Sequence, residues 1–218
     1  MTLANYEGVI KNLPYLEQAF ETKKVTWQRE YGTHKRFSEF CDNVFEKNVL
    51  KLSRSDLFKA AANDFYQGMF SVILWGYPRN MRGNTFSIIL NSIELIKSFL
   101  PNEKHIAAEQ FSALVRQLNG TGIGLSTLTK ALYFFCYRID GVQCLILDRR
   151  IIDVINNSIF SELNAIGGIT EFNKGDKYLS YLKKMADISS LYKYKPDQLE
   201  QFLFLFGRNL KPCSDTSY

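Results

Sequence analysis

The sequence predicts an all-α fold whose helices form two lobes. Apolar residues recur at helical spacing along most of the chain, strand signals are weak, and no repeat, low-complexity segment or long linker divides the sequence. The chain has 218 residues, of which 46% are hydrophobic and 22% charged, as in ordinary globular proteins. A chain of this length buries roughly 70% of its unfolded surface, so we expect a substantial core.

Residues 1–54 are expected to form an N-terminal helical segment of unclear role. Residues 6–21 show amphipathic spacing, and Pro14 should break or kink that helix because proline has no amide hydrogen to donate. Residues 23–54 mix charged and aromatic side chains and predict no definite element. The remaining residues, 55–218, are expected to form the functional core.

Apolar runs bounded by polar or turn-forming residues predict the helices of this core. They span residues 55–75, 85–100, 103–118, 178–192 and 198–209. Ser53 or Ser55 can cap the first helix, Pro101 ends the second, and Gly120 helps to close the third. The segment 142–147, VQCLIL, could form a strand but has no evident partner.

The charged, cysteine and histidine residues restrict the kinds of site that the chain can carry. The formal net charge is +5 and the isoelectric point about 8.9, which allows a polyanionic partner without requiring one. The four cysteines form no CxxC pair and there are only two histidines, which argues against a zinc site or an iron–sulfur cluster. We therefore expect no metal and no cofactor.

The cysteine spacing and the hydropathy pattern predict a cytoplasmic protein. No disulfide framework is evident, which favours a reducing compartment. The first residues lack the basic and apolar regions of a signal peptide, and no run approaches the roughly 18 apolar residues of a membrane span. We expect a monomer without membrane contact.

A glycine-rich turn precedes the part of the chain that carries the most chemical information. Gly120, Gly122 and Gly124 alternate after Asn119, between two expected helices. Such a turn exposes backbone N–H groups beside a helix N-terminus, and these groups bind phosphate well. It is not a nucleotide-binding fingerprint, because no strand precedes it and no GK[ST] follows. A plain connection between two helices is the competing interpretation.

Lys130 lies in the apolar helix that follows this turn. A lysine at the edge of an apolar helix commonly extends its ammonium to water. A partly desolvated lysine has a lowered pKa, so that its neutral amine can act as a nucleophile. The sequence leaves both interpretations open.

Asp148 follows the apolar segment LIL and precedes RRIIDVI, where a new helix is expected to begin. Aspartate is an ordinary N-cap residue there. It also stays ionised at a helix start, as a carboxylate must if it is to stabilise a developing cation. One residue can serve as both cap and catalytic group.

Four arginines flank these segments. Arg79 and Arg82 lie in the turn-forming stretch YPRNMRGN, and Arg149 and Arg150 follow Asp148 directly. They are either solvated surface residues or contacts to a nucleic-acid backbone, which guanidinium groups bind readily.

Taken together, the turn, Lys130 and Asp148 resemble the helix-hairpin-helix DNA glycosylases, and most closely their bacterial 8-oxoguanine DNA glycosylase-like branch. Three further stretches look similar to that branch: LWGYPRNMRGN, TKALYFFCYRIDGVQCLILDRRI, and YLSYLKKMADISS with the later DQLEQFLFLFG. The resemblance covers roughly residues 55–208. Residues 1–54 resemble no family that we identify.

The resemblance implies that Lys130 is the Schiff-base lysine and Asp148 the catalytic aspartate. It also implies that the hairpin, residues 119–124, binds a DNA phosphate through its backbone amides. Two features depart from the family pattern. Ser126 stands where the family lysine commonly stands, one helical turn before Lys130, and the hairpin reads NGTGIG where LPGVG is usual.

The expected function is therefore that of a DNA N-glycosylase, with or without AP-lyase activity, that excises oxidised or otherwise modified bases such as 8-oxoguanine from double-stranded DNA. The setting is either DNA repair or bacterial antiviral defence. The alternative is a non-catalytic helix-hairpin-helix DNA-binding protein in which Lys130 only packs and Asp148 only caps. Base flipping requires an aromatic-lined pocket, for which the chain has 17 Phe, 12 Tyr and 2 Trp.

Overall fold

The computed structural model describes residues 1–45 and 47–210, and 61% of these residues are helical. The α-helices are α1 (Glu7–Lys11), α2 (Lys35–Val44), α3 (Arg54–Asn63), α4 (Phe65–Gly76), α5 (Thr85–Asn91), α6 (Ile93–Phe99), α7 (Ala108–Gln117), α8 (Leu125–Phe134), α9 (Arg149–Asn156), α10 (Lys174–Tyr192) and α11 (Pro196–Leu205). Short 3-10 helices add η1 (Leu3–Tyr6), η2 (Tyr15–Glu17), η3 (Lys24–Trp27), η4 (Ser161–Ile166) and η5 (Gly207–Asn209). The predicted mainly α fold is confirmed.

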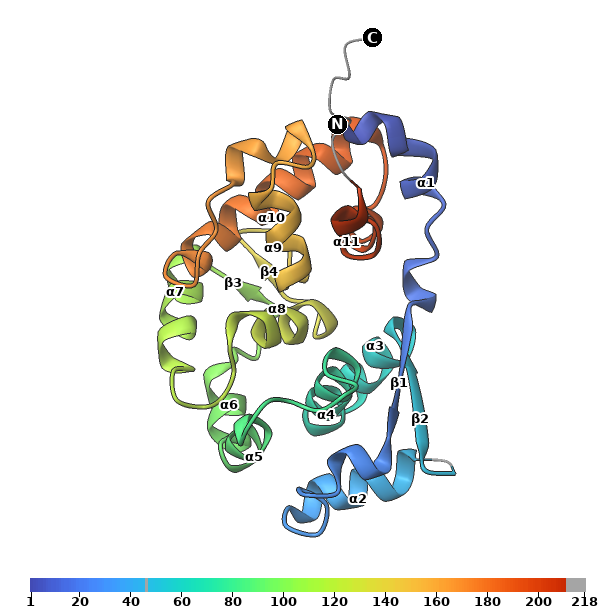
Figure 1. The fold of residues 1–218 in the computed structure, drawn as a ribbon. Coiled ribbons are helices and arrows are strands. Elements are labelled where there is room, and N and C mark those ends of the chain that lie inside the picture. The colour runs from blue at the N-terminus through green and yellow to red at the C-terminus, as the bar shows by residue number, and fades with distance from the viewer. Residues whose placement is uncertain (46, 211–218) are drawn as a thin grey trace.

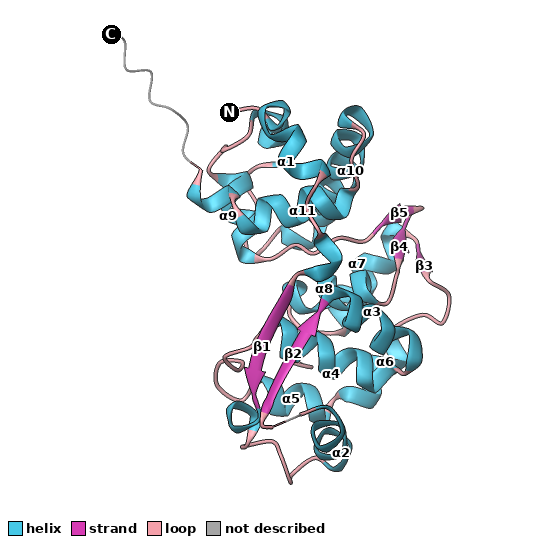
Figure 2. Cartoon of the chain, turned by 90° about the vertical axis from the view of Figure 1, so that its right-hand side faces the viewer, coloured by secondary structure: helices cyan, strands magenta, loops and turns pink. Residues whose placement is uncertain are grey.

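The helices form two groups that meet around α8 (Figures 1 and 2). One group contains α2 to α6 together with the first two strands. The other contains α1, α9, α10 and α11, so the N-terminal residues pack beside the last helix although they are far apart in sequence. Helix α8 contacts α3 and α4 on one side, and its residues also bond to the second group, as described below.

The N-terminal segment differs from the expected helical one. Helix α1 ends at Lys11, and strand β1 (Ala19–Lys23) pairs antiparallel with β2 (Val49–Ser53). Phe20 lies opposite Leu52 and Glu21 opposite Lys51, an apolar and an oppositely charged cross-strand pair. The partners are about 30 residues apart, so spacing within either strand does not reveal the pairing. Strand β2 leads into α3 without a linker.

The predicted helix over 55–75 is divided into α3 and α4 at Asp64. This residue has extended backbone angles, and its side chain accepts hydrogen bonds from the N–H groups of Tyr66 and Gln67. It therefore caps α4 and ends α3 at the same position. Gly68 lets the two helices approach closely, because a Cβ there would lie 2.7 Å from the Ala61 Cα atom.

The segment 142–147 is only partly a strand. Val142–Gln143 forms β5, which pairs with β4 (Arg138–Ile139), and β4 pairs in parallel with β3 (His105–Ile106). Residues 144–147 are buried without regular structure. The Leu145 and Ile146 carbonyls accept hydrogen bonds from side chains of α10, so the apolar run is an extended segment inside the core.

Two sequence expectations concern absent features. No helix among the described residues is long and apolar enough to cross a membrane. Over the same residues, no group of three or more His, Cys, Asp or Glu side chains is placed to hold a metal ion.

Candidate active site

The glycine-rich turn connects α7 and α8, as the sequence predicts. Gly120 and Gly122 have φ angles of +83° and +80°, which glycine adopts without strain. Gly122 also packs against α5, where a Cβ would lie 2.9 Å from the Thr85 carbonyl oxygen. The N–H groups of Gly120, Gly122 and Gly124 donate to no acceptor among the residues that the structure describes. The turn therefore offers several backbone donors beside the N-terminus of α8.

Lys130 is buried, with 5% of its surface exposed. Its aliphatic chain passes over Gly76, where a Cβ would lie 3.0 Å from Lys130 Cδ. Its Nζ atom donates to Ser126 Oγ at 2.7 Å and to the Ser126 carbonyl at 3.3 Å, and lies 5.5 Å from the centre of the Tyr77 ring. The ammonium does not extend freely to water. Ser126 and Tyr77, the two residues beside the amine, are half-buried.

The contact with Ser126 bears directly on the departure noted in the sequence. Helical side chains lean toward the N-terminus of their helix, so Lys130 reaches back over one turn. Its amine arrives at the residue that stands two positions after the last glycine of the hairpin. The lysine is displaced in sequence, but its nitrogen lies beside the expected position.

Asp148 is the N-cap of α9. Its Oδ1 atom accepts from the N–H groups of Arg150 at 2.9 Å and Ile151 at 3.1 Å. The second oxygen, Oδ2, accepts no hydrogen bond from the described part of the chain. The residue is half-buried. One oxygen thus caps the helix while the other is available to a positive charge, so the cap does not exclude a catalytic role.

Three hydroxyl groups fix the segment that leads to Asp148. Thr129 Oγ1 accepts from the Leu147 N–H at 3.2 Å, so the residues that precede Lys130 and Asp148 are directly bonded. From α10, Tyr178 donates to the Leu145 carbonyl at 2.7 Å and Tyr181 to the Ile146 carbonyl at 2.9 Å. Burial raises the pKa of both phenols well above their usual value, which keeps them protonated as donors. Thr129, Tyr178 and Tyr181 lie in stretches that resemble the family branch, but sequence analysis assigned no role to these three residues.

A buried polar network joins the two helix groups. Arg54 of α3 donates to Glu200 of α11 at 2.6 Å, to Gln18 at 2.7 Å and to the Tyr133 hydroxyl at 3.2 Å. Tyr133 in turn donates to Asp197 at 2.7 Å. Burial raises the pKa of the Glu200 carboxyl and Arg54 opposes this, while the nearby Asp148 carboxylate adds to the increase. Asp148 therefore lies within electrostatic range of the network, which the sequence did not predict.

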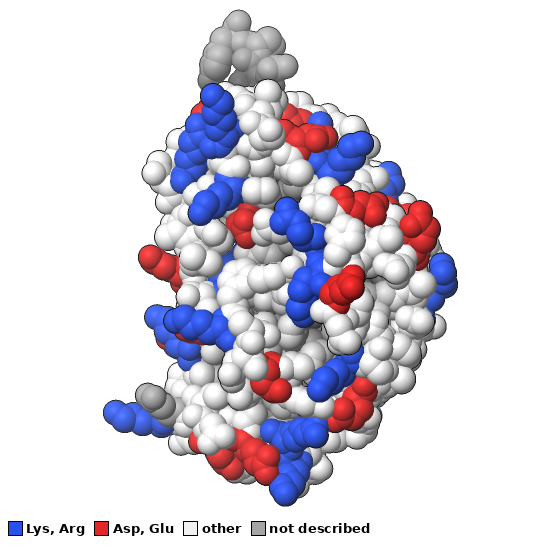
Figure 3. Space-filling model, turned by 180° about the vertical axis from the view of Figure 1, so that it is seen from behind, with Lys and Arg blue, Asp and Glu red and all other residues white. Residues whose placement is uncertain are grey.

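The four candidate arginines are exposed and do not form one cluster around Lys130. Arg79 and Arg82 lie in the loop between α4 and α5. Arg149 forms an ion pair with Asp153 at 2.8 Å, and the Arg150 guanidinium lies 4.8 Å from the centre of the Phe204 ring. On the face shown in Figure 3, basic and acidic side chains are interspersed, with several Lys and Arg side chains near the middle. Their predicted role in DNA binding stays a prediction.

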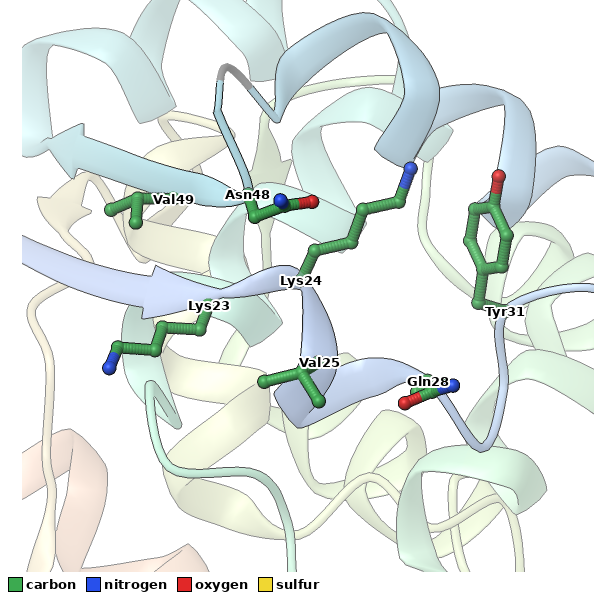
Figure 4. Close-up of a pocket in the computed structure, with 7 residues that line it drawn as sticks. All are labelled: Lys23, Lys24, Val25, Gln28, Tyr31, Asn48 and Val49. Carbon is green, nitrogen blue, oxygen red and sulfur yellow. The ribbon is translucent and has the colours of Figure 1, made fainter.

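A pocket of about 600 Å³ lies away from the candidate catalytic residues (Figure 4). It is lined by Lys23, Lys24, Val25, Gln28, Tyr31, Asn48 and Val49. Neither Lys130 nor Asp148 contributes to it, so it is not the place where these two residues would act together.

Comparison with known protein families assigns the chain to one family. A family model described as "Putative 8-oxoguanine DNA glycosylase OGG-like protein" matches residues 14–204. The match begins well before residue 55 and so includes the β1–β2 hairpin, in a segment where the sequence had shown no resemblance. Neither a curated protein nor a solved structure shows significant similarity to the chain. The match spans most of the chain and includes the hairpin, Lys130 and Asp148, and on this basis the protein belongs to the 8-oxoguanine DNA glycosylase OGG-like family.

Proposed function

We propose that this protein is a DNA N-glycosylase that releases oxidised or otherwise modified bases from double-stranded DNA, with Lys130 as nucleophile and Asp148 as the carboxylate that stabilises the sugar cation. The observation that carries the proposal is the position of the Lys130 amine, 2.7 Å from Ser126 Oγ at the start of α8. It brings a desolvated amine close to the hairpin, whose unbonded N–H groups can hold a DNA phosphate.

The chemistry requires both residues. Breaking the N-glycosidic bond leaves positive charge on the sugar, and a nearby carboxylate lowers the energy of that state. Oδ2 of Asp148 is available for this purpose while Oδ1 caps α9. The Lys130 amine, in its neutral form, adds to C1′ as the base leaves with the bonding electron pair. The Nζ–C1′ adduct loses one proton to solvent and the departing base takes one up, so that charge is balanced.

The lyase step would follow from the same intermediate. Ring opening converts the amine adduct into an imine between Nζ and C1′. Removal of a proton from C2′ then expels the 3′-phosphate and nicks the strand. If water instead of Nζ attacks C1′, only the base is released. We propose base release as the central activity, and imine formation as the test of whether lyase activity accompanies it.

The setting of this activity is either DNA repair or antiviral defence, since both use the same bond cleavage. The alternative function is DNA binding without catalysis, in which Ser126 merely satisfies the buried Lys130 ammonium. The hydrogen bond between them is compatible with that function as well, so the two must be separated by experiment.

The experiment compares Asp148→Asn with Asp64→Asn. Both aspartates are N-caps whose Oδ1 accepts two backbone N–H groups, at 2.9 and 3.0 Å for Asp64 and at 2.9 and 3.1 Å for Asp148. Asparagine caps helices about as well as aspartate, so both variants should keep the wild-type unfolding temperature. Base release from duplexes with single modified bases should fall by orders of magnitude only in Asp148→Asn.

Lys130→Gln completes the test. It should abolish borohydride trapping of the enzyme on lesion DNA and leave DNA affinity nearly unchanged. Lys104→Gln is the control, because Lys104 also lies against an aromatic ring, 4.5 Å from the centre of the Tyr137 ring, but is exposed and, unlike Lys130, donates no hydrogen bond to Ser126. Wild-type base release in both Lys130→Gln and Asp148→Asn would reject the catalytic roles of these two residues. Duplex binding by the unmodified protein without any base release would leave only the non-catalytic DNA-binding function.

A further inference from the structure

We propose that the segment containing η3 and the loop between α4 and α5 form one DNA-backbone-binding surface that extends the active-site face. We call it the η3 rim and define it by five exposed residues, Lys23, Val25, Arg29, Arg79 and Arg82. The identity of the partner rests on the proposed function. The sequence predicted no role for the segment around η3, because neither Lys23 nor Arg29, the two residues that flank it, belongs to a recognisable motif.

Three hydrogen bonds hold the two parts of the η3 rim together. Thr22 Oγ1 donates to the Pro78 carbonyl at 2.9 Å, and Asn80 Nδ2 donates to the Thr26 carbonyl at 2.9 Å. Arg29 donates to Asn84 Oδ1 at 2.6 Å. These bonds run from one end of the loop to the other, so the loop and η3 form a single ordered surface although more than 50 residues separate the bonded partners.

The same loop begins at the candidate active site. Tyr77 is its first residue, and the Tyr77 hydroxyl lies 2.7 Å from Thr127 Oγ1 in α8. The Tyr77 ring also faces the Lys130 amine at 5.5 Å. DNA bound with its modified base at Lys130 would therefore have its backbone next to this loop.

The charge of the η3 rim suits a phosphate backbone. Lys23, Arg79 and Arg82 form no ion pair among the described residues, and the Arg29 hydrogen bond goes to a neutral amide, so four positive charges remain. Two of the three neighbouring acids are paired or buried. Asp42 pairs with Lys24 at 2.8 Å and Glu30 is buried, while Glu21 is exposed and lies opposite Lys51 in the hairpin.

The shape of this surface also suits a DNA backbone. Figure 4 shows Lys23 and Val25 at one side of the hollow of about 600 Å³ and Tyr31 at the other. Val25 is 66% exposed and offers an apolar contact to a sugar edge, beside a lysine that can reach the adjoining phosphate. Lys24 is not available for that purpose, because it lies 4.4 Å from the centre of the Tyr31 ring and is paired with Asp42.

The test measures the salt dependence of binding to an undamaged duplex by fluorescence anisotropy. Each lost phosphate contact reduces the slope of log K against log salt concentration by about 0.9. Lys23→Gln/Arg29→Gln should therefore reduce the magnitude of the slope by about 1.8. Lys23→Gln alone, which breaks no hydrogen bond of the fold, should reduce it by about 0.9.

Lys183→Gln/Lys193→Gln is the charge-matched control. Both lysines are exposed and lie at or after α10 in the other helix group (Figure 1), so this variant should keep the wild-type slope. Slopes that fall equally in the rim and control variants, or in neither, would overturn the proposal.

Base release by the unmodified protein is measured in parallel, so that the two proposals can fail separately. A rim-dependent slope without base release would retain the η3 rim and reject the proposed glycosylase. Base release by the unmodified protein, with an unchanged slope in the rim variants, would retain the proposed glycosylase and reject the η3 rim. Absence of DNA binding by the unmodified protein would reject both.

Discussion

Alanine substitution at the three hairpin glycines should produce three different losses of stability. Gly120→Ala places a side chain at a φ of +83° with no atom within 4 Å of the new Cβ, so it should cost only the left-handed backbone strain of about 1–2 kcal/mol. Gly122→Ala has the same strain and places its Cβ 2.9 Å from a backbone oxygen of α5. Overpacking adds about 1–3 kcal/mol. Gly124→Ala has a φ of −82° and an open surrounding, so its effect should stay within about 1 kcal/mol.

Urea unfolding of the three variants, with the free energy extrapolated to water, would test this order. Equal losses at Gly120 and Gly122 would refute the packing of the turn against α5. A loss at Gly124 as large as that at Gly122 would refute the conformation of the turn. These stability measurements also show which glycine is suited to a test of DNA binding by the hairpin. Gly124→Leu should weaken duplex binding at near wild-type stability. A bulky residue at Gly122 would weaken binding and stability together.

Two further outcomes follow from buried groups. Arg54→Met should cost about 3–5 kcal/mol of unfolding free energy, because it leaves the buried Glu200 carboxyl without its partner. Adding Glu200→Leu to this variant should recover part of that loss. Strictly additive losses in a double-mutant cycle measured by denaturation would contradict the coupling between the two residues. Burial raises the pKa of the Cys144 thiol to about 12, and only the thiolate form of a cysteine reacts with iodoacetamide. At pH 8, iodoacetamide should therefore label exposed Cys136 well before Cys144 in the native protein, as measured by peptide mass spectrometry. Equal labelling rates would contradict the burial of Cys144.

Local sequence signals were sufficient to predict most helices of this protein and several of their ends. The N-cap at Asp148, the glycine-rich turn at 119–124 and the stop before Pro101 each depend on a few adjacent residues and on the backbone groups beside them. The apolar spacing that predicts a helix is also local. These features were therefore readable without knowledge of the rest of the chain.

Long-range pairing decided what the sequence did not predict. The β1–β2 hairpin joins strands whose residues find partners about 30 positions away, and the Arg54–Glu200 pair joins residues separated by 146 positions. Nothing near Arg54 in the sequence distinguishes a buried arginine from a solvated one.

The candidate site likewise combines features that the local sequence predicts with contacts that depend on the tertiary structure. Lys130 and Asp148 stand out in the sequence because each is a charged residue beside an apolar run. The contact of the Lys130 amine with Ser126 depends on the space above Gly76, and the bond between Thr129 and Leu147 depends on how the extended segment crosses α8. Side-chain direction and packing between distant elements determine these contacts, and only the tertiary structure specifies them.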